Sequence, residues 1–413
     1  MLLANGVIIV TSTKLMLRGG CNTRARKRRR LCAISNCRLL VKIYGFVNFL
    51  TVDVLNEIFI LLPRVSNKYL RSLTIFHAHC TVIMGGQWSQ FFPPNPQITE
   101  KDLDLLSGKV FLITGGYSGI GLELAKILYR NHGRVYIAGR SEEKARQAIQ
   151  DIQTAVPSST RSLEFMLVDL ADLTTIKPAV QTFVSKESRL DVLWNNAGIS
   201  QPPLGSVSAQ GIELQLATNS FGPFLLTQLL LPLLQKTAAN SPLAGSVRVA
   251  WTSSQVVELA AAQGGFTMDE IRNPPKDKAL NYTNSKLGNW FLSSELARRC
   301  AMNDNGGDDQ IISVALNPGA AGTDLFRHTP WLPYLAWPLM YSPVLLAHTE
   351  LYAGLSNEIT VDKSGCYVAP FGRIWDTPRK DLLGAMKLAD EEGGSGRASE
   401  FWEYCAEVTR DYM

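Results

Sequence analysis

Between Lys109 and residue 375, short apolar runs rich in β-branched residues alternate with longer amphipathic segments. Such runs are typical of parallel strands buried on both faces, and the longer segments are typical of helices. Short connections between them predict βαβ units, so we expect an α/β fold with one doubly wound parallel sheet. The predicted strands are Lys109–Thr114, Arg134–Ala138, Leu163–Val168, Asp191–Asn195, Ser246–Thr252 and Ile311–Leu316.

A glycine-rich turn, Gly115-Gly116-Tyr117-Ser118-Gly119-Ile120-Gly121, joins the first predicted strand to a predicted helix. Gly115 permits a tight turn, Gly119 lets the backbone approach a pyrophosphate, and Gly121 permits close packing of helix and strand. The N–H groups and the dipole at the start of the helix favour phosphate. Glycine clusters also occur in ordinary turns, but this position between strand and helix indicates a Rossmann-type dinucleotide site.

The end of the second predicted strand, Gly139-Arg140-Ser141, bears on the choice of cofactor. An acidic residue about 20 positions beyond the glycines would bind the free 2′-hydroxyl of NAD(H). Arg140 stands there instead, and a guanidinium with an adjacent serine suits a 2′-phosphate. The alternative is a surface arginine at the start of a helix capped by Ser141. We therefore predict NADP(H) in preference to NAD(H).

Two later groups of residues also carry chemistry. Asn195-Asn196-Ala197-Gly198 closes the fourth predicted strand, where small and amide side chains suit the lining of a nucleotide site. Tyr282 and Lys286 are four residues apart in a predicted helix, which places the phenol and the ammonium on one face. A nearby ammonium lowers the pKa of a phenol from about 10, so Tyr282 is a candidate general acid/base for carbonyl–alcohol interconversion. The same spacing also arises by chance on exposed helices.

Taken together, these motifs resemble the short-chain dehydrogenase/reductase family. The resemblance covers roughly residues 105–370 and rests, in chain order, on TGGYSGIG, Asp169-Leu170, NNAG, Ser253-Ser254, YTNSK and Asn317-Pro318-Gly319. The segments GLELAKILYRNHGRVYIAGRSEEKA and NSFGPFLLTQLLLPLL are similar to the retinol-dehydrogenase-like and fungal short-chain oxidoreductase branch. The resemblance implies a single Rossmann-type catalytic domain and an enzyme acting on CH–OH and C=O groups.

The resemblance also implies a catalytic set of four residues. Tyr282 would pass a proton to or from the substrate oxygen, and Lys286 would hold the nicotinamide ribose and lower the tyrosine pKa. Ser254 would hydrogen-bond the substrate carbonyl, with Ser253 as the alternative serine. Asn219, within the long helix after NNAG, would anchor a water of the proton relay, and its alternative is a packing role.

For the cofactor, the resemblance implies that Asp169 lies against the adenine, Asn195 beside its ribose and Thr323 at the nicotinamide carboxamide. Asp169 is also a common type of helix N-cap, which is its alternative role. The predicted cofactor-binding residues are Gly115, Ser118, Gly119, Ile120, Gly121, Arg140, Asp169, Leu170, Asn195, Asn196, Ala197, Gly198, Tyr282, Lys286, Pro318, Gly319 and Thr323. We expect no metal site, because the histidines show no ligand spacing outside the pair His77 and His79.

Two segments bear on the substrate. Ser254 and Tyr282 lie further apart in the sequence than is usual in the family, and we interpret the intervening segment as an insertion that shapes the substrate site. An apolar segment after Thr323 is interrupted by prolines, which exclude one long helix. It favours a lipophilic ketone, aldehyde or alcohol, although it would also suit contact with another subunit or a membrane. Its apolar residues include Trp331, Leu332, Tyr334, Leu335, Trp337, Leu339 and Met340.

Residues 1–83 differ from the rest in charge, because they carry a net +11 within a chain whose total is +5, which leaves −6 for the remainder. We interpret them as a solvated basic extension, and the run Arg24–Arg30 as an alternative localisation or anionic-surface patch. Met84 opens a segment that resembles a natural N-terminus, in which case Gly85 would fit a myristoylation pattern. The acidic remainder of the chain gives nucleic-acid binding no support.

These patterns predict an NADP(H)-preferring oxidoreductase for a lipophilic carbonyl/alcohol pair, with a catalytically silent dinucleotide-binding protein as the alternative. We expect a lead-in at 84–104, the catalytic domain at 105–375, and a linker and helix at 376–413. An odd number of cysteines without paired spacing favours a reducing compartment, hence a cytoplasmic protein or one peripheral to an intracellular membrane. A homodimer is a further expectation.

Overall fold

The structure is a computed structural model that describes residues 3–4, 7–8, 88–157, 162–302, 311–329 and 339–413. Contacts divide the chain into two units, Met1–Cys80 and Thr81–Met413. In the first unit, β1 (Leu3–Ala4) and β2 (Val7–Ile8) form an antiparallel pair. The sequence-based interpretations of Arg24–Arg30, His77, His79, Met84, Gly85 and the apolar residues at 331–337 lie outside the described residues.

An eight-stranded sheet forms the centre of the second unit, in the order β12-β11-β8-β7-β6-β3-β4-β5. Every neighbouring pair is parallel except β11 and β12. The strands are β3 (Val110–Thr114), β4 (Arg134–Gly139), β5 (Leu163–Leu167), β6 (Val192–Asn195), β7 (Arg248–Thr252), β8 (Ile312–Leu316), β11 (Tyr367–Ala369) and β12 (Arg373–Ile374). The predicted doubly wound α/β fold is confirmed, and all six predicted strands are present.

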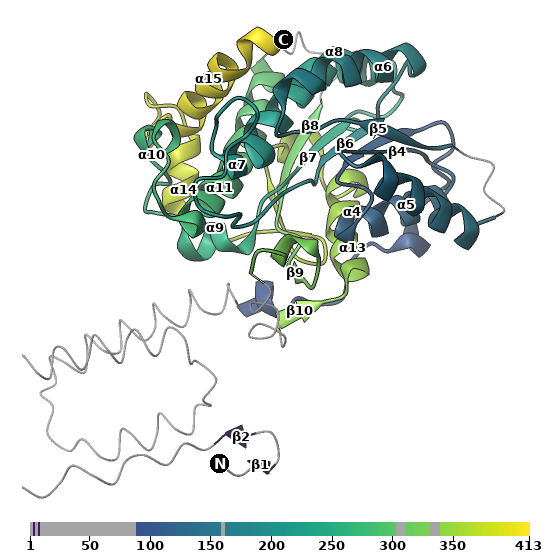
Figure 1. The fold of residues 1–413 in the computed structure, drawn as a ribbon, viewed down its shortest axis with the longest axis horizontal. Coiled ribbons are helices and arrows are strands. Elements are labelled where there is room, and N and C mark those ends of the chain that lie inside the picture. The colour runs from purple at the N-terminus through teal and green to yellow at the C-terminus, as the bar shows by residue number, and fades with distance from the viewer. Residues whose placement is uncertain (1–2, 5–6, 9–87, 158–161, 303–310, 330–338) are drawn as a thin grey trace, which may run out of the picture. The chain divides into compact units, whose positions relative to one another are not determined.

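Helices cover both faces of this sheet, as Figure 1 shows. Alternate residues of β3 point to opposite faces, so Leu112 joins one core and Phe111 and Ile113 join the other. The first core includes α6 (Ile176–Lys186), α8 (Gly222–Ala239) and α11 (Lys278–Met302). The second includes α4 (Gly119–Arg130), α5 (Glu142–Ala155) and α13 (Pro343–Leu355). Ser141 caps α5 as predicted, because its hydroxyl accepts from the Lys144 N–H.

Smaller elements complete the described part of the chain. They are α7 (Leu214–Leu216), the π-helix η3 (Ala217–Phe221), β9 (Ala320–Ala321), β10 (Met340–Tyr341) and the 3₁₀ turns η1 (Glu100–Asp102), η2 (Leu173–Thr175), η4 (Asp324–Phe326), η6 (Val361–Lys363) and η7 (Arg410–Tyr412). The segment between Ser254 and Tyr282 forms α9 (Gln255–Ala260) and α10 (Met268–Arg272). No described helix combines the length and apolarity needed to span a bilayer.

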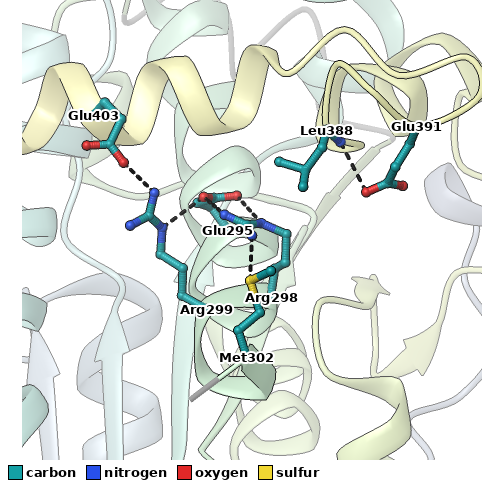
Figure 2. A network of polar contacts seen from close by, with 7 residues as sticks. All are labelled: Glu295, Arg298, Arg299, Met302, Leu388, Glu391 and Glu403. Carbon is teal, nitrogen blue, oxygen red and sulfur yellow. Dashed lines mark hydrogen bonds and ion pairs between the residues drawn. The ribbon is translucent and has the colours of Figure 1, made fainter. Parts of the chain in front are cut away.

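The C-terminal segment contains α14 (Lys380–Met386) and α15 (Arg397–Thr409), and α15 packs on α11. Figure 2 shows the polar network between these two helices. The buried Glu295 carboxylate accepts hydrogen bonds from Arg298 and from Arg299, whose Nε lies 2.8 Å from Oε1. Arg299 also reaches Glu403 on α15. This network ties the last helix to the helix that carries Tyr282 and Lys286.

Candidate active site

The order of the strands reverses between β3 and β6, because β4 follows β3 on one side and β6 lies on the other. In such sheets, ligands bind beyond the carboxyl ends of the strands at this switch point. The glycine-rich turn lies there, between β3 and α4. Gly115 and Gly119 adopt left-handed φ values of 67° and 56°, which glycine tolerates without strain. A Cβ on Gly121 would lie 2.6 Å from Asn196 Nδ2 and 2.7 Å from the Gly115 carbonyl oxygen.

The predicted NNAG segment packs against this turn. Asn196 Nδ2 donates to the Thr114 carbonyl at 2.8 Å, and the Ala197 N–H donates to the Thr114 hydroxyl at 3.0 Å. Asn195 points elsewhere: its Nδ2 donates to Thr227 Oγ1 on α8 at 2.9 Å, and the side chain is fully buried. The side chain of Asn195 therefore joins β6 to α8, whereas Asn196 supports the glycine turn.

The segment after β8 reaches the same place. The Thr323 methyl group lies 3.2 Å from the position that a Cβ on Gly119 would occupy. Gly319 has a φ of 96°, and its N–H donates to Asn317 Oδ1 at 3.0 Å. The Pro318 carbonyl accepts from the Thr349 hydroxyl of α13. Three predicted cofactor segments, around residues 115–121, 195–198 and 318–323, thus meet at one edge of the sheet.

The remaining predicted cofactor residues lie along the same edge. Arg140 is exposed just after β4, and Arg140 and Asp169 both line a groove of about 620 Å³ beside β4, β5 and α6. Asp169 Oδ1 accepts from the Ala171 N–H at 2.9 Å, which is an Asx turn. The N-cap of the 3₁₀ turn η2 that follows is Asp172, so the capping role considered for Asp169 belongs to Asp172. Leu170 is buried against Gly222 at the start of α8. Ser118 is the N-cap residue of α4, and Ile120 is half-buried in its first turn.

The four predicted catalytic side chains are linked to one another and to Gly198 of the NNAG segment. Tyr282 and Lys286 lie one turn apart on α11, and Tyr282 shares a side-chain hydrogen bond with Ser254. Ser253 instead donates its hydroxyl to the Lys286 carbonyl at 2.9 Å. Ser254, not Ser253, therefore faces the Tyr282 hydroxyl. Helix α11 begins at Lys278, one turn before Tyr282.

Asn219 lies in the π-helical turn immediately before α8, and its amide is engaged with backbone. Its Oδ1 accepts from the Ile199 N–H at 2.9 Å, and its Nδ2 donates to the Ile199 carbonyl at 3.0 Å and to Ser285 Oγ at 2.9 Å. A Cβ on Gly198 would lie 3.1 Å from Lys286 Nζ and 3.3 Å from Asn219 Oδ1. Lys286 Nζ and Asn219 Oδ1 therefore both lie close to Gly198.

Burial governs the protonation of the two groups on α11. Burial raises the pKa of Tyr282 to about 12, although the hydrogen bond with Ser254 acts in the opposite direction. Burial also lowers the pKa of Lys286 to about 8, although the Glu350 carboxylate raises it. The sequence predicted a lowered tyrosine pKa. The structure differs because removing the phenolate from water outweighs the stabilising contacts, and because Lys286 Nζ donates to the Thr252 carbonyl at 2.9 Å.

Sequence reasoning missed three residues behind Lys286. The Thr252 carbonyl also accepts from Asn289 Nδ2 at 2.9 Å, and the Thr252 hydroxyl donates to Glu350 Oε1 at 2.8 Å. Glu350 is completely buried in α13. A signal for it existed, because a glutamate within the apolar helix PVLLAHTELYAGL must find a polar partner when that helix is buried.

Comparisons with known proteins identify the family of the chain. The short chain dehydrogenase family model matches residues 109–253. A short-chain dehydrogenase/reductase of Phomopsis amygdali is 44% identical over 331 residues, which cover 79% of this chain and 97% of that protein. The short-chain dehydrogenase/reductase iacJ of Pestalotiopsis fici is 43% identical over 324 residues, covering 77% of this chain and 95% of iacJ.

A crystal structure of an uncharacterized protein from Mycobacterium Paratuberculosis is also similar. It is 25% identical with a TM-score of 0.54, and the match covers 76% of this chain and 97% of that one. The two fungal relatives match at much higher identity and over nearly their whole length. The chain therefore belongs to the short-chain dehydrogenase/reductase family, and it is an NAD(P)-dependent oxidoreductase acting on CH–OH and C=O groups.

Proposed function

We propose that the protein is an NADP(H)-preferring oxidoreductase that interconverts a lipophilic ketone or aldehyde and its alcohol, with Tyr282 as general acid/base. The observation that carries the proposal is that Tyr282 is hydrogen-bonded to Ser254, and that Lys286, one turn further along the same helix, lies with Asn219 next to Gly198. We retain the retinol-dehydrogenase-like branch as part of the proposal. The catalytically silent alternative has no support from the comparisons.

The glycine turn fits a dinucleotide. Gly115 and Gly119 are in left-handed conformations, and at Gly121 the close packing of Asn196 and Gly115 leaves no room for a side chain. Such a turn at the start of a helix suits a pyrophosphate. The residues that would hold the cofactor are those predicted from the sequence, apart from the Asn195 side chain, which is buried against α8, and Thr323 lies beside Gly119. When bound, the nicotinamide supplies or accepts the hydride.

Tyr282 and Ser254 would act on the substrate oxygen. The pKa of Tyr282, about 12, keeps the phenol protonated at neutral pH, so in carbonyl reduction it donates a proton to the oxygen that receives negative charge. Ser254 is hydrogen-bonded to the same phenol and is therefore placed to bond the same oxygen. In alcohol oxidation the direction reverses, and the hydrogen bond with Ser254 then favours the phenolate.

Lys286 and Asn219 would complete the proton path. Lys286 Nζ and Asn219 Oδ1 both lie close to Gly198, and we propose that a water bound near these two groups returns a proton towards Tyr282. The Asn219 side chain bonds both the N–H and the carbonyl of Ile199, which holds the backbone next to Gly198 in place. In this arrangement Asn219 has the packing contacts of its alternative role and still borders the relay.

Arg140 is the basis for the NADP(H) preference. It is exposed at the end of β4, where its guanidinium is available to a 2′-phosphate. The lipophilic substrate class rests on the apolar composition of the sequence after Thr323 and on the α9–α10 segment that directly follows Ser254.

The test is oxidation of NADPH and of NADH with a panel of lipophilic ketones and aldehydes. We expect turnover with NADPH that falls about 10²-fold or more in Tyr282→Phe, because the proton donor is lost. Tyr412→Phe in the C-terminal turn is the matched control and should retain full activity. Binding of NADPH by the Tyr282→Phe protein, followed by nicotinamide fluorescence, shows that the variant is folded. Undiminished turnover in Tyr282→Phe would refute the assignment.

A further inference from the structure

Glu350 is a completely buried carboxylate that the mechanism above does not use. Burying a carboxylate is costly unless it is paired and hydrogen-bonded. One oxygen, Oε1, accepts from the Thr252 hydroxyl at 2.8 Å, and the other, Oε2, has no hydrogen-bond partner among the described residues. A carboxylate in this position therefore needs a positive charge nearby. The positively charged residue nearest in the hydrogen-bond network is the one on the other side of Thr252.

That residue is Lys286. Thr252 is the last residue of β7, and its backbone carbonyl accepts from Lys286 Nζ at 2.9 Å while its hydroxyl holds Glu350. Asn289, one turn beyond Lys286 on α11, donates to the same carbonyl and fixes its direction. Lys286 is itself almost fully buried. Two buried groups of opposite charge are thus joined through one residue, where little water screens their attraction.

No other described charge competes for Glu350. Helix α13 packs against α4, β6, β7, β8, β9 and β11. The titratable groups on α13 and on these described elements are Glu123, Lys126, Tyr129, Arg130, Arg248, His348, Tyr352 and Tyr367. Four of them are engaged elsewhere: Glu123 and Lys126 pair with each other, His348 contacts Glu100, and Tyr352 donates to Glu358. Arg248 donates to three carbonyls at the end of α13 and beyond it. Among the described residues, Lys286 is the charge that acts on Glu350.

We propose that Glu350 is a positioning residue that, through Thr252, keeps the Lys286 side chain in place and in its ammonium form. The inference rests on the proposed role of Lys286. Burial alone drives both groups towards their neutral forms, and their mutual attraction opposes this, which leaves pKa values of about 7 for Glu350 and about 8 for Lys286. Removing the carboxylate leaves the ammonium buried without a counter-charge, so Lys286 loses its proton at a lower pH.

The pH profile of kcat/KM for carbonyl reduction tests this effect. The pKa of Tyr282 is about 12, so a decline of kcat/KM between pH 7 and 9, the alkaline limb of the profile, reports the loss of the proton from Lys286. Glu350→Gln keeps the size of the side chain and an oxygen for Thr252 but removes the charge. We expect the alkaline limb to move to lower pH by at least one unit. A uniform loss of activity with an unmoved limb would show a merely structural role and overturn the proposal.

The matched control is Glu295→Gln. Glu295 is also a buried carboxylate, but it lies on α11 and its partners are Arg298 and Arg299. The substitution lowers stability but should leave the limb where it is. If Glu350→Gln does not fold, Thr252→Val removes the hydroxyl that holds the carboxylate, and the limb should move in the same direction. An unmoved limb in a folded Thr252→Val protein would equally contradict the proposal.

A second readout uses the protein without cofactor. The folded-state pKa of Glu350, about 7, lies above its ordinary value of 4.5. The stability linked to this group is therefore fully present below pH 4.5 and is lost as the pH rises through 7. The Tm of the native protein should fall relative to that of Glu350→Gln between pH 5 and 7, and a constant difference would contradict the buried titration. Lys286→Met, assayed separately, distinguishes failure of the proposed function, because unchanged turnover there removes Lys286 itself from catalysis.

Discussion

Replacing Gly121 by alanine is a sharp test of the glycine turn as a cofactor cradle. Gly121 is in the first turn of α4 and does not have a left-handed φ, so alanine fits the backbone and its helix propensity is favourable by about 1 kcal/mol. The added Cβ would lie 2.6 Å from Asn196 Nδ2 and 2.7 Å from the Gly115 carbonyl oxygen. Ordinary contacts with a Cβ begin at 3.4 Å, so the side chain and the backbone must both move.

The movement has a definite energetic cost. Overpacking of this kind costs about 1–3 kcal/mol, and the propensity gain offsets part of it, so we expect a net destabilisation of about 0–2 kcal/mol. The larger effect falls on the cofactor, because Asn196 must leave the Thr114 carbonyl and Gly115 must shift within the turn. A loss of about 1.4 kcal/mol in binding free energy is a tenfold change in Kd. We therefore expect NADPH to bind at least about tenfold more weakly.

The assay is titration of NADPH fluorescence together with thermal unfolding of the cofactor-free protein. The matched control is Gly322→Ala, next to Thr323, where a Cβ meets nothing within 4 Å and the φ is not left-handed. That variant should bind NADPH like the native protein. Equal affinity of Gly121→Ala and the native protein, with the variant folded, would refute the cradle argument.

Three further outcomes are expected. Arg140→Asp should reduce the ratio of NADPH to NADH affinity by tenfold or more, since it removes a charge-assisted bond to the 2′-phosphate; an unchanged ratio of the two Kd values would contradict this role. Ser254→Ala should lower kcat/KM about 10²-fold while Ser253→Ala retains most activity, and equal losses in the steady-state assay would contradict the geometric distinction. Burial acts to raise the pKa of Glu295, but hydrogen bonds from Arg298 and Arg299 outweigh burial and keep this pKa below its ordinary 4.5. The stability that Glu295 contributes is therefore present above pH 4.5 and is lost as the pH falls through the folded-state pKa. The Tm difference between the native protein and Glu295→Gln should therefore shrink on acidification, and a difference that grows would contradict it.

Much of the fold was predictable because its signals are local. A buried parallel strand is apolar along its whole length, and Val110–Thr114 and Ile312–Leu316 show this directly. The position of the glycine turn between strand and helix, and the one-turn spacing of Tyr282 and Lys286, also depend only on neighbouring residues. The strands β11 and β12 were not predicted, because they are too short to show a pattern and pair only where the sheet provides an edge.

The details of the site depend on contacts between distant parts of the chain. Packing decides which of the two adjacent serines faces Tyr282, because it brings Ser254 to the phenol. It also decides which of the two adjacent asparagines supports the turn, because Thr227 binds Asn195 and leaves Asn196 at the turn.

The sequence by itself determined the elements, their order and the types of side chain at the carboxyl ends of the strands, since these follow from local periodicity and spacing. Only the tertiary structure decided the direction of the Tyr282 pKa and the link from Lys286 through Thr252 to Glu350, which lies on a different helix far along the chain. The physical reason is that desolvation and charge pairing depend on everything packed around a group, and those neighbours come from across the whole fold.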